Sequence, residues 1–229
     1  MEILIYVSKI TNRLFYIIEL ILKEELGISF KFTTDKEKYL SHEGPKMHYG
    51  KSPLENDNGL FLQSVNLLFE RDIADQDVKL CKYNDTKAIF PVFNDNSILP
   101  FDVLAASFYI ITRYEEYLPH VSDQYNRFQP KDSILYKMDA FETPIINVWA
   151  KELGEIITSK YPDIQLKKKT FKFIPTYDID AAWAYRNKGL FRTTAAFLRD
   201  ALVFNTDEIK RRYEVLTKKK IDPFDTFDY

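Results

Sequence analysis

The stretch "ILIYVSKITNRLFYIIELILKEELGISFKFTT", residues 3–34, determines how the first part of this chain folds. The run "ILIYV" (3–7) predicts a short buried strand, and residues 13–26 predict a helix that Asn12 caps and Gly27 ends. The alternation in "ISFKFT" (28–33) predicts a second strand with one buried face. A strand, a helix and a strand in this order predict two parallel strands joined by a right-handed crossover.

The rest of residues 1–168 continues an α/β pattern and predicts a domain with a mixed, partly parallel sheet. Residues 35–60 are rich in charge, Gly and Pro and are expected to be mostly loop, while 59–69 fit a strand or a short helix. The Lys-rich segment 163–170 marks the boundary to a second domain, 169–229. A solvated linker is the simpler interpretation of this segment, and a binding site for an anionic ligand is the alternative. The further elements expected are strands at 78–83, 88–93 and 171–177, and helices at 101–118, 144–161, 190–204 and 206–220.

Composition disfavours several classes of protein. The 229 residues carry a formal net charge of −2, which argues against broad attraction to nucleic acids or membranes. The sequence holds no apolar run long enough to cross a bilayer and does not begin like a signal peptide, so the expected compartment is the cytoplasm. The single cysteine, Cys81, allows neither an intrachain disulfide nor a cysteine zinc cluster. The six glycines are scattered, which excludes a glycine-rich phosphate loop.

The three histidines offer little chemistry by their spacing. His42 and His48 are expected in the loop 35–60, and His120 follows Pro119 at a helix end. None of them lies four residues from another on an expected helix, so no histidine pair has helical metal-ligand spacing. Each is therefore read as a structural residue.

Asp178 and Asp180 directly follow the apolar run "FKFIPTY" (171–177), at the end of an expected strand. On an extended chain both side chains point the same way, with Ile179 opposite. Ligands gather at the carboxyl ends of strands in α/β sheets and barrels. Two carboxylates on one face repel each other unless a cation lies between them or one holds a proton. The spacing fits a metal ligand beside a base, and it equally fits a capping acid beside a solvated one.

Three long segments resemble a known family. The segments "FIPTYDIDAAWAYRNKG" (173–189) and "DPFDTFDY" (222–229) are similar to the start of the catalytic domain of polysaccharide deacetylases, the NodB-type carbohydrate esterases. The segment "LPFDVLAASFYIITRYEEYLPHVSDQYNRF" (99–128) resembles the N-terminal domain of a bacterial group in which an uncharacterised α/β domain precedes the deacetylase domain. The resemblance implies that 169–229 form the first strand and helices of an incomplete (β/α) barrel.

The resemblance also implies roles for the two acids. Asp178 maps to the catalytic base and Asp180 to a metal ligand, although the usual motif has adjacent aspartates followed by Gly, whereas here Ile179 separates them. The family completes its zinc site with a later His-x-x-x-His pair, and no histidine follows His120 in this sequence. The expectation is therefore an N-terminal portion of a deacetylase of acetylated saccharides, with no activity and no bound metal in this fragment itself.

Other readings remain open. The chain could be a non-catalytic binding or scaffolding module, or a nucleotide-sugar enzyme in which Asp-x-Asp holds a divalent metal on a diphosphate. Trp183, three residues after Asp180, is the better of the two tryptophans for a wall that stacks a sugar, and Trp149 is expected in the core. Arg113 and Glu116 predict an exposed intrahelical ion pair. The apolar residues of an incomplete barrel are expected to pack on the first domain, to pair with a second copy of the chain through the open strand edge, or to be poorly ordered, and a homodimer is the favoured outcome.

Overall fold

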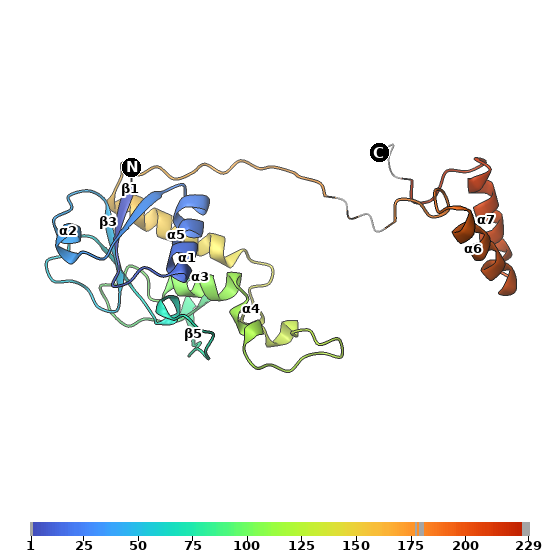
Figure 1. The fold of residues 1–229 in the computed structure, drawn as a ribbon. Coiled ribbons are helices and arrows are strands. Elements are labelled where there is room, and N and C mark those ends of the chain that lie inside the picture. The colour runs from blue at the N-terminus through green and yellow to red at the C-terminus, as the bar shows by residue number, and fades with distance from the viewer. Residues whose placement is uncertain (1, 177, 179–180, 226–229) are drawn as a thin grey trace. The chain divides into compact units, whose positions relative to one another are not determined.

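The computed structural model describes residues 2–176, 178 and 181–225 (Figure 1). The chain divides into two compact units, Met1–Lys169 and Thr170–Tyr229, called unit 1 and unit 2 below. Each unit has its own secondary structure and is described by itself. Among the described residues, every helix is too short or too polar to cross a membrane.

Unit 1 begins with the β-α-β arrangement predicted from residues 3–34. Strands β1 and β2 run parallel, with Ile3 opposite Phe30 and Ile5 opposite Phe32. Ile3 and Ile5 are fully buried, because the helix that follows β1 covers them. The prediction of two neighbouring parallel strands is confirmed. The elements are β1 (Glu2–Tyr6), α1 (Asn12–Ile18), a π-helical continuation η1 (Glu19–Glu25) and β2 (Ser29–Thr33).

The helix after β1 differs in detail from the prediction. Thr11, not Asn12, is the N-cap, and its hydroxyl accepts a hydrogen bond from the Leu14 N–H at 3.1 Å. The helix ends as predicted at Gly27, whose φ of +75° is unfavourable for a residue with a side chain. The π-helical turns of η1 could not be expected from the spacing of apolar residues, which fits an ordinary helix.

The predicted loop 35–60 is wrong in two places, because it contains a short helix and a central strand of the sheet. Strand β3 pairs in parallel with β1 on one side and with β4 on the other. The glycines and Pro45 around β3 are loop signals, and they hid a strand whose own residues include Lys46 and His48. The elements are α2 (Lys36–Leu40), β3 (Lys46–Gly50) and β4 (Leu60–Gln63).

The four strands form an all-parallel sheet in the order β2-β1-β3-β4. The α/β class is confirmed, whereas the expected mixed sheet is wrong, since the antiparallel pairing lies in a separate hairpin. That hairpin joins β5 (Leu80–Tyr83) to β6 (Thr86–Ile89). The helices α1 and α2 lie on opposite sides of the sheet (Figure 1), as right-handed crossovers in opposite directions require.

Helical segments before and after the hairpin complete unit 1. The predicted helix 101–118 is interrupted, because Arg113 adopts a left-handed conformation with φ of +52°. Arg113 still forms the predicted ion pair with Glu116, on the surface and across this break. Trp149 is 1% exposed and packs on Phe101 at 5.1 Å between ring centroids, so it belongs to the core as expected. The elements are η2 (Leu67–Phe69), α3 (Val103–Ile111), η3 (Tyr114–Tyr117), η4 (Pro130–Asp132), α4 (Ile134–Met138) and α5 (Ile145–Lys160).

The Lys-rich segment at the end of unit 1 is not a free linker. The Lys167 N–H donates to the Leu26 carbonyl at 2.8 Å, and its ammonium donates to the Glu24 carbonyl at 3.0 Å. Lys169 forms an ion pair with Glu25. Cations are favourable at this position, because the carbonyl groups of the last turn of a helix carry partial negative charge.

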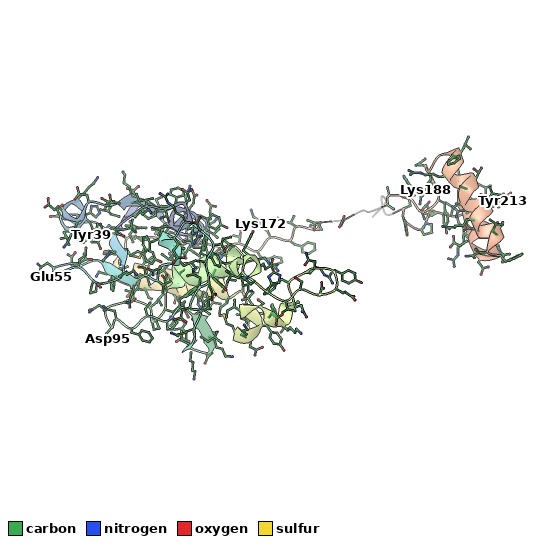
Figure 2. All side chains as sticks on the ribbon, turned by 60° about the horizontal axis from the view of Figure 1, so that its bottom comes forward. Tyr39, Glu55, Asp95, Lys172, Lys188 and Tyr213 are labelled. Carbon is green, nitrogen blue, oxygen red and sulfur yellow. The ribbon has the colours of Figure 1, made fainter. Side chains whose placement is uncertain are left out.

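Unit 2 contains the two predicted helices, α6 (Leu190–Leu202) and α7 (Thr206–Leu216). The predicted strand 171–177 is wrong over residues 171–176, which have no regular structure, and Tyr177 lies outside the described residues. A strand needs a hydrogen-bonded neighbour, and no described segment pairs with 171–176. The described part of unit 2 therefore shows two helices and no barrel. Figure 2 labels Tyr213, whose ring lies on the outside of α7 and is 53% exposed.

Candidate functional site

Asp178 is the part of the predicted acid pair that the structure describes. Its side chain is exposed, and it follows a segment whose apolar side chains are exposed as well. Asp180 and Ile179 lie outside the described residues, so the predicted shared face of the two carboxylates stays a prediction. An exposed carboxylate at this position is accessible to a substrate or a cation, and within the described residues it does not cap a helix.

Trp183 is half-buried beside Arg186, whose guanidinium carbon lies 5.9 Å from the centre of the indole ring. The backbone next to Trp183 is fixed by Asp222. The Asp222 carboxylate accepts hydrogen bonds from the N–H groups of Ala184 at 2.8 Å, Tyr185 at 2.8 Å and Arg186 at 3.0 Å. Trp183 therefore lies next to a loop whose backbone is hydrogen-bonded to Asp222, as suits a wall of a binding site.

Asp222 itself is a structural acid that sequence reasoning missed. Its side chain is 2% exposed, and the Phe224 N–H donates a further hydrogen bond at 3.0 Å. Burial alone would raise the pKa of Asp222, but the backbone N–H groups of Arg186, Tyr185 and Ala184 outweigh it and lower the pKa to about 2. The carboxylate thus stays charged and holds the loop 184–186 to the end of unit 2. The sequence signal for this structural role was the position of Asp222 directly before a proline, in "DPF".

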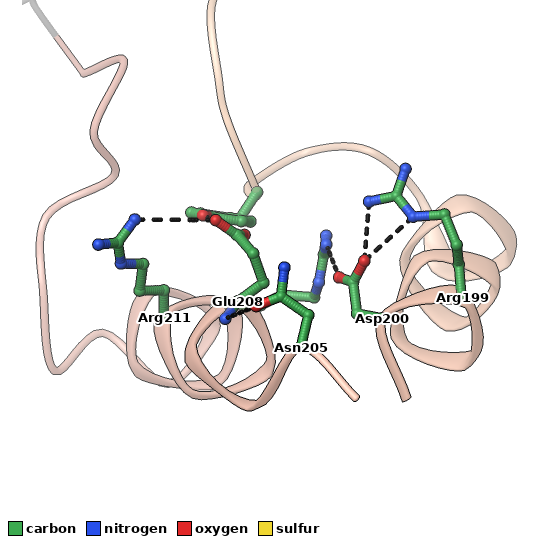
Figure 3. A network of polar contacts seen from close by, with 7 residues as sticks. Arg199, Asp200, Asn205, Glu208 and Arg211 are labelled. Carbon is green, nitrogen blue, oxygen red and sulfur yellow. Dashed lines mark hydrogen bonds and ion pairs between the residues drawn. The ribbon is translucent and has the colours of Figure 1, made fainter. Parts of the chain in front are cut away.

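A polar network joins α6 to α7 and is drawn in Figure 3. Asp200 is 2% exposed; it accepts from Arg199 at 2.8 Å and from Arg212 at 2.6 Å. The hydrogen bonds from Arg199 first, and then from Arg212, lower the pKa of Asp200 below its ordinary value. Tyr185 donates to Glu208 at 2.7 Å, which ties the Trp183 loop to α7. Every carboxylate here is satisfied by its own chain, so the network is structural.

The described residues do not fit the zinc site that the resemblance implies. Catalytic zinc takes three protein ligands, mostly histidine nitrogens and carboxylates. Within the described ranges, no group of three or more His, Cys, Asp or Glu side chains could hold a metal ion. All three histidines belong to unit 1. We therefore assign no step of a reaction to a metal held by this chain.

The histidines themselves have structural surroundings. His48, predicted in a loop, lies on β3, is 4% exposed and packs against Tyr6 and Phe61 at ring distances of 5.2 and 5.3 Å. Burial lowers the pKa of His48 to about 4, so the ring is neutral at pH 7. His42 lies in the turn after α2. His120 is exposed, and its Nδ1 lies 2.8 Å from the Leu118 carbonyl oxygen.

Comparisons with known proteins identify one relationship. Residues 3–162 match the model of a family described as "Family of unknown function (DUF7033)". The match covers most of unit 1 and stops before Asp178. No curated protein and no solved structure matches the chain.

Proposed function

The chain belongs to DUF7033, a family of unknown function, and we propose that it is the N-terminal part of a carbohydrate deacetylase whose catalytic domain begins with unit 2. The resemblance of residues 173–189 and 222–229 to the start of NodB-type domains supports the proposal. In this reading Asp178 accepts a proton from the water that attacks an acetyl carbonyl. Trp183 stacks against the sugar.

The observation that carries the proposal is the exposure of the apolar segment directly before Asp178. Phe171 is 93% exposed, Phe173 80% and Ile174 74%. Such side chains are expected inside a core, since burying one stabilises a fold by about 1.5–3 kcal/mol. In a closed barrel every strand has a neighbour on each edge. The segment thus has the composition of a core strand and the surroundings of one whose neighbours are missing from the described residues.

Acetate release is the assay that tests the proposal. We expect the purified chain to release no acetate from an N-acetylated or an O-acetylated oligosaccharide, with or without added zinc. The product of the gene's whole reading frame should release it. We also expect that reading frame to encode a His-x-x-x-His pair after Tyr229, because the described residues do not complete a zinc site.

Two outcomes would contradict the proposal. One is a reading frame that encodes no further domain after Tyr229. The other is a whole product that binds zinc and cleaves neither acetylated saccharide. Stable folding of the chain without any acetate release from the whole product would favour the non-catalytic binding module.

A further inference from the structure

The strand order of unit 1 creates a place where ligands bind in parallel sheets. From β1 the chain crosses to β2, which lies on one side of β1. From β2 it crosses back to β3, which lies on the other side of β1, so the direction of the crossovers reverses next to β1. In open α/β sheets, ligands bind in the crevice outside the carboxyl ends of the strands at such a reversal. Nothing in the family match assigns a function to this end of the sheet.

A cavity of about 400 Å³ lies at this end of the sheet. It is lined by residues 9–13, which follow β1, and by Glu70 and Arg71, which follow β4 and η2. Its size is within the range of about 300–1,000 Å³ that is usual for small-molecule sites. Three of its lining side chains, Lys9, Arg13 and Arg71, are cationic, and one, Glu70, is anionic.

The guanidinium of Arg13 is held rigidly beside this cavity. It donates to the carbonyl oxygens of Leu67 at 2.9 Å, Arg71 at 3.2 Å and Asp72 at 2.9 Å. It also lies 5.7 Å from the Phe108 ring centre and 5.5 Å from that of Tyr114. A guanidinium has five N–H donors. Both donors of Nη2 and one of Nη1 are used, so Nε–H and one Nη1–H have no partner among the described residues. A charged group that is fixed in this way loses little entropy when it binds a ligand.

The positive charge of the cavity is only partly offset by Glu70. Within the described residues, Lys9, Arg13 and Arg71 form no ion pair, and the Glu70 carboxylate accepts from Gln76 at 2.9 Å. The Thr11 hydroxyl already caps the helix, so the cations, and not the helix start, make this an anion site. Because both Nη2 hydrogens are already used, Arg13 can offer a phosphate its fixed charge and single charge-assisted hydrogen bonds from Nε or Nη1, but not a paired fork.

We propose that this cavity binds the phosphate group of a small phosphorylated molecule, with Arg13 as the fixed anchor and Lys9 and Arg71 as flanking cations. The net positive charge of the lining favours a dianionic phosphomonoester over a single carboxylate. The proposal concerns unit 1 and is independent of deacetylation.

Isothermal titration of the full chain at constant ionic strength tests the site. The probes are inorganic phosphate, a hexose monophosphate, a nucleoside monophosphate and acetate. Phosphate and at least one phosphomonoester should bind with one site per chain, and acetate should bind at least about tenfold more weakly, because it carries less charge. A preference between the two esters identifies the attached group. Binding of free phosphate alone, with no ester, would overturn the proposal.

Variants test whether phosphate binding depends on the cations of this cavity or on the overall charge of the chain. The double variant Lys9→Ala, Arg71→Ala should weaken phosphate binding by about tenfold or more, because two charge-assisted contacts are lost. Both side chains are exposed, so the fold should not change. Arg13→Lys keeps the positive charge but loses the guanidinium that the Leu67, Arg71 and Asp72 carbonyls fix in place, and it should also weaken phosphate binding. The matched control, Lys38→Ala with Lys151→Ala, removes two exposed cations elsewhere in unit 1 and should bind like the wild type. Equal weakening in the control, unchanged binding in the Lys9/Arg71 variant, or no binding by the wild type would each overturn the proposal.

Discussion

The buried carboxylate of Asp102 connects separate segments of unit 1. Its side chain is fully buried and accepts hydrogen bonds from the Tyr49 hydroxyl at 2.7 Å, the Val65 N–H at 2.7 Å and the Ala105 N–H at 3.0 Å. These donors come from β3, the loop after β4 and α3, so one residue joins three parts of unit 1. The sequence predicted a helix near Asp102 but not this role, because the partners lie far away along the chain.

Asp102→Asn should therefore destabilise unit 1. The new amide group brings N–H donors to a place where three donors already point, so buried hydrogen-bonding groups lose their partner. We expect a loss of about 2–3 kcal/mol in the free energy of unfolding, measured in urea. Tyr49→Phe removes only one of the bonds and should cost about 1 kcal/mol. Equal losses in the two variants would show that the carboxylate does not organise the three parts of unit 1.

His48 gives the stability of unit 1 a pH dependence of known sign. Burial lowers the pKa of His48 to about 4, below its ordinary value of 6.5. The unfolded chain thus binds a proton more readily, and stability is lost as the pH falls from about 6.5 towards 4. Burial also raises the pKa of Asp102 to about 6, from an ordinary 3.8, which lowers stability as the pH rises through nearly the same window. The two residues oppose each other.

Replacing His48 with Phe separates the two contributions. The variant should gain stability relative to the wild type as the pH is lowered from 7.5 to 5, by about 2 kcal/mol if the folded pKa is as low as 4. Urea midpoints of both proteins at the two pH values measure this. A constant difference between the proteins would show that His48 does not titrate abnormally.

At the scale of elements, two glycines with the same backbone conformation allow a controlled comparison. Gly27 and Gly189 have φ of +75° and +74°. A Cβ on Gly27 would lie 2.8 Å from the Lys167 Cβ, whereas a Cβ on Gly189 would meet nothing within 4 Å. The first glycine therefore serves both the end of a helix and the close approach of the Lys-rich segment.

Gly27→Ala should cost clearly more than Gly189→Ala. Both substitutions strain the backbone by about 1 kcal/mol, and the first must also displace the Lys167 segment from the Leu26 carbonyl. Urea unfolding and proteolysis of the segment 163–170 measure the two effects. Similar costs, with the segment equally protected in both variants, would mean that its packing on η1 contributes little.

The elements that the sequence predicted well are those whose apolar residues follow one long, regular pattern. Residues 3–33 and 144–160 are of this kind. The strand β3 was missed because Lys46 and His48 interrupt its apolar pattern; both are buried, and the Lys46 ammonium donates to the Leu40 carbonyl at 3.0 Å. The strand at 171–176 was predicted and is absent, because a pattern describes what a segment can bury and not whether neighbours are present. For the same reason, the sequence predicts that Asp178 and Asp180 follow a strand but does not show which other residues surround them.

At the scale of the whole molecule, an apolar face of α6 is left uncovered by the described residues of unit 2. Phe191, Leu198 and Leu202 recur at helical spacing on α6 and are 86%, 67% and 80% exposed. They are distinct from the face with Asp200, which meets Arg212 of α7. Exposed apolar patches of this kind tend to find a partner.

We expect a second copy of the chain to cover this face, so the purified protein should be a dimer in light scattering. Leu198→Glu with Leu202→Glu places two charges on the face and should give a monomer with unchanged helix content by circular dichroism. Lys210→Glu changes an exposed residue on α7 and should leave the dimer intact. A wild-type chain that is monomeric at high concentration, with α6 and α7 formed, would contradict this account of the patch.

The role of Asp178 as the base of a deacetylase is tested most directly by the rate of acetate release from the product of the whole reading frame. Asp178→Asn should lower kcat by about 100-fold or more, since a general base contributes about 10²–10⁴ to a rate. The control Asp163→Asn, at an exposed acid of unit 1, should keep the wild-type rate. An Asp178→Asn enzyme that releases acetate as fast as the wild type would contradict the proposed function.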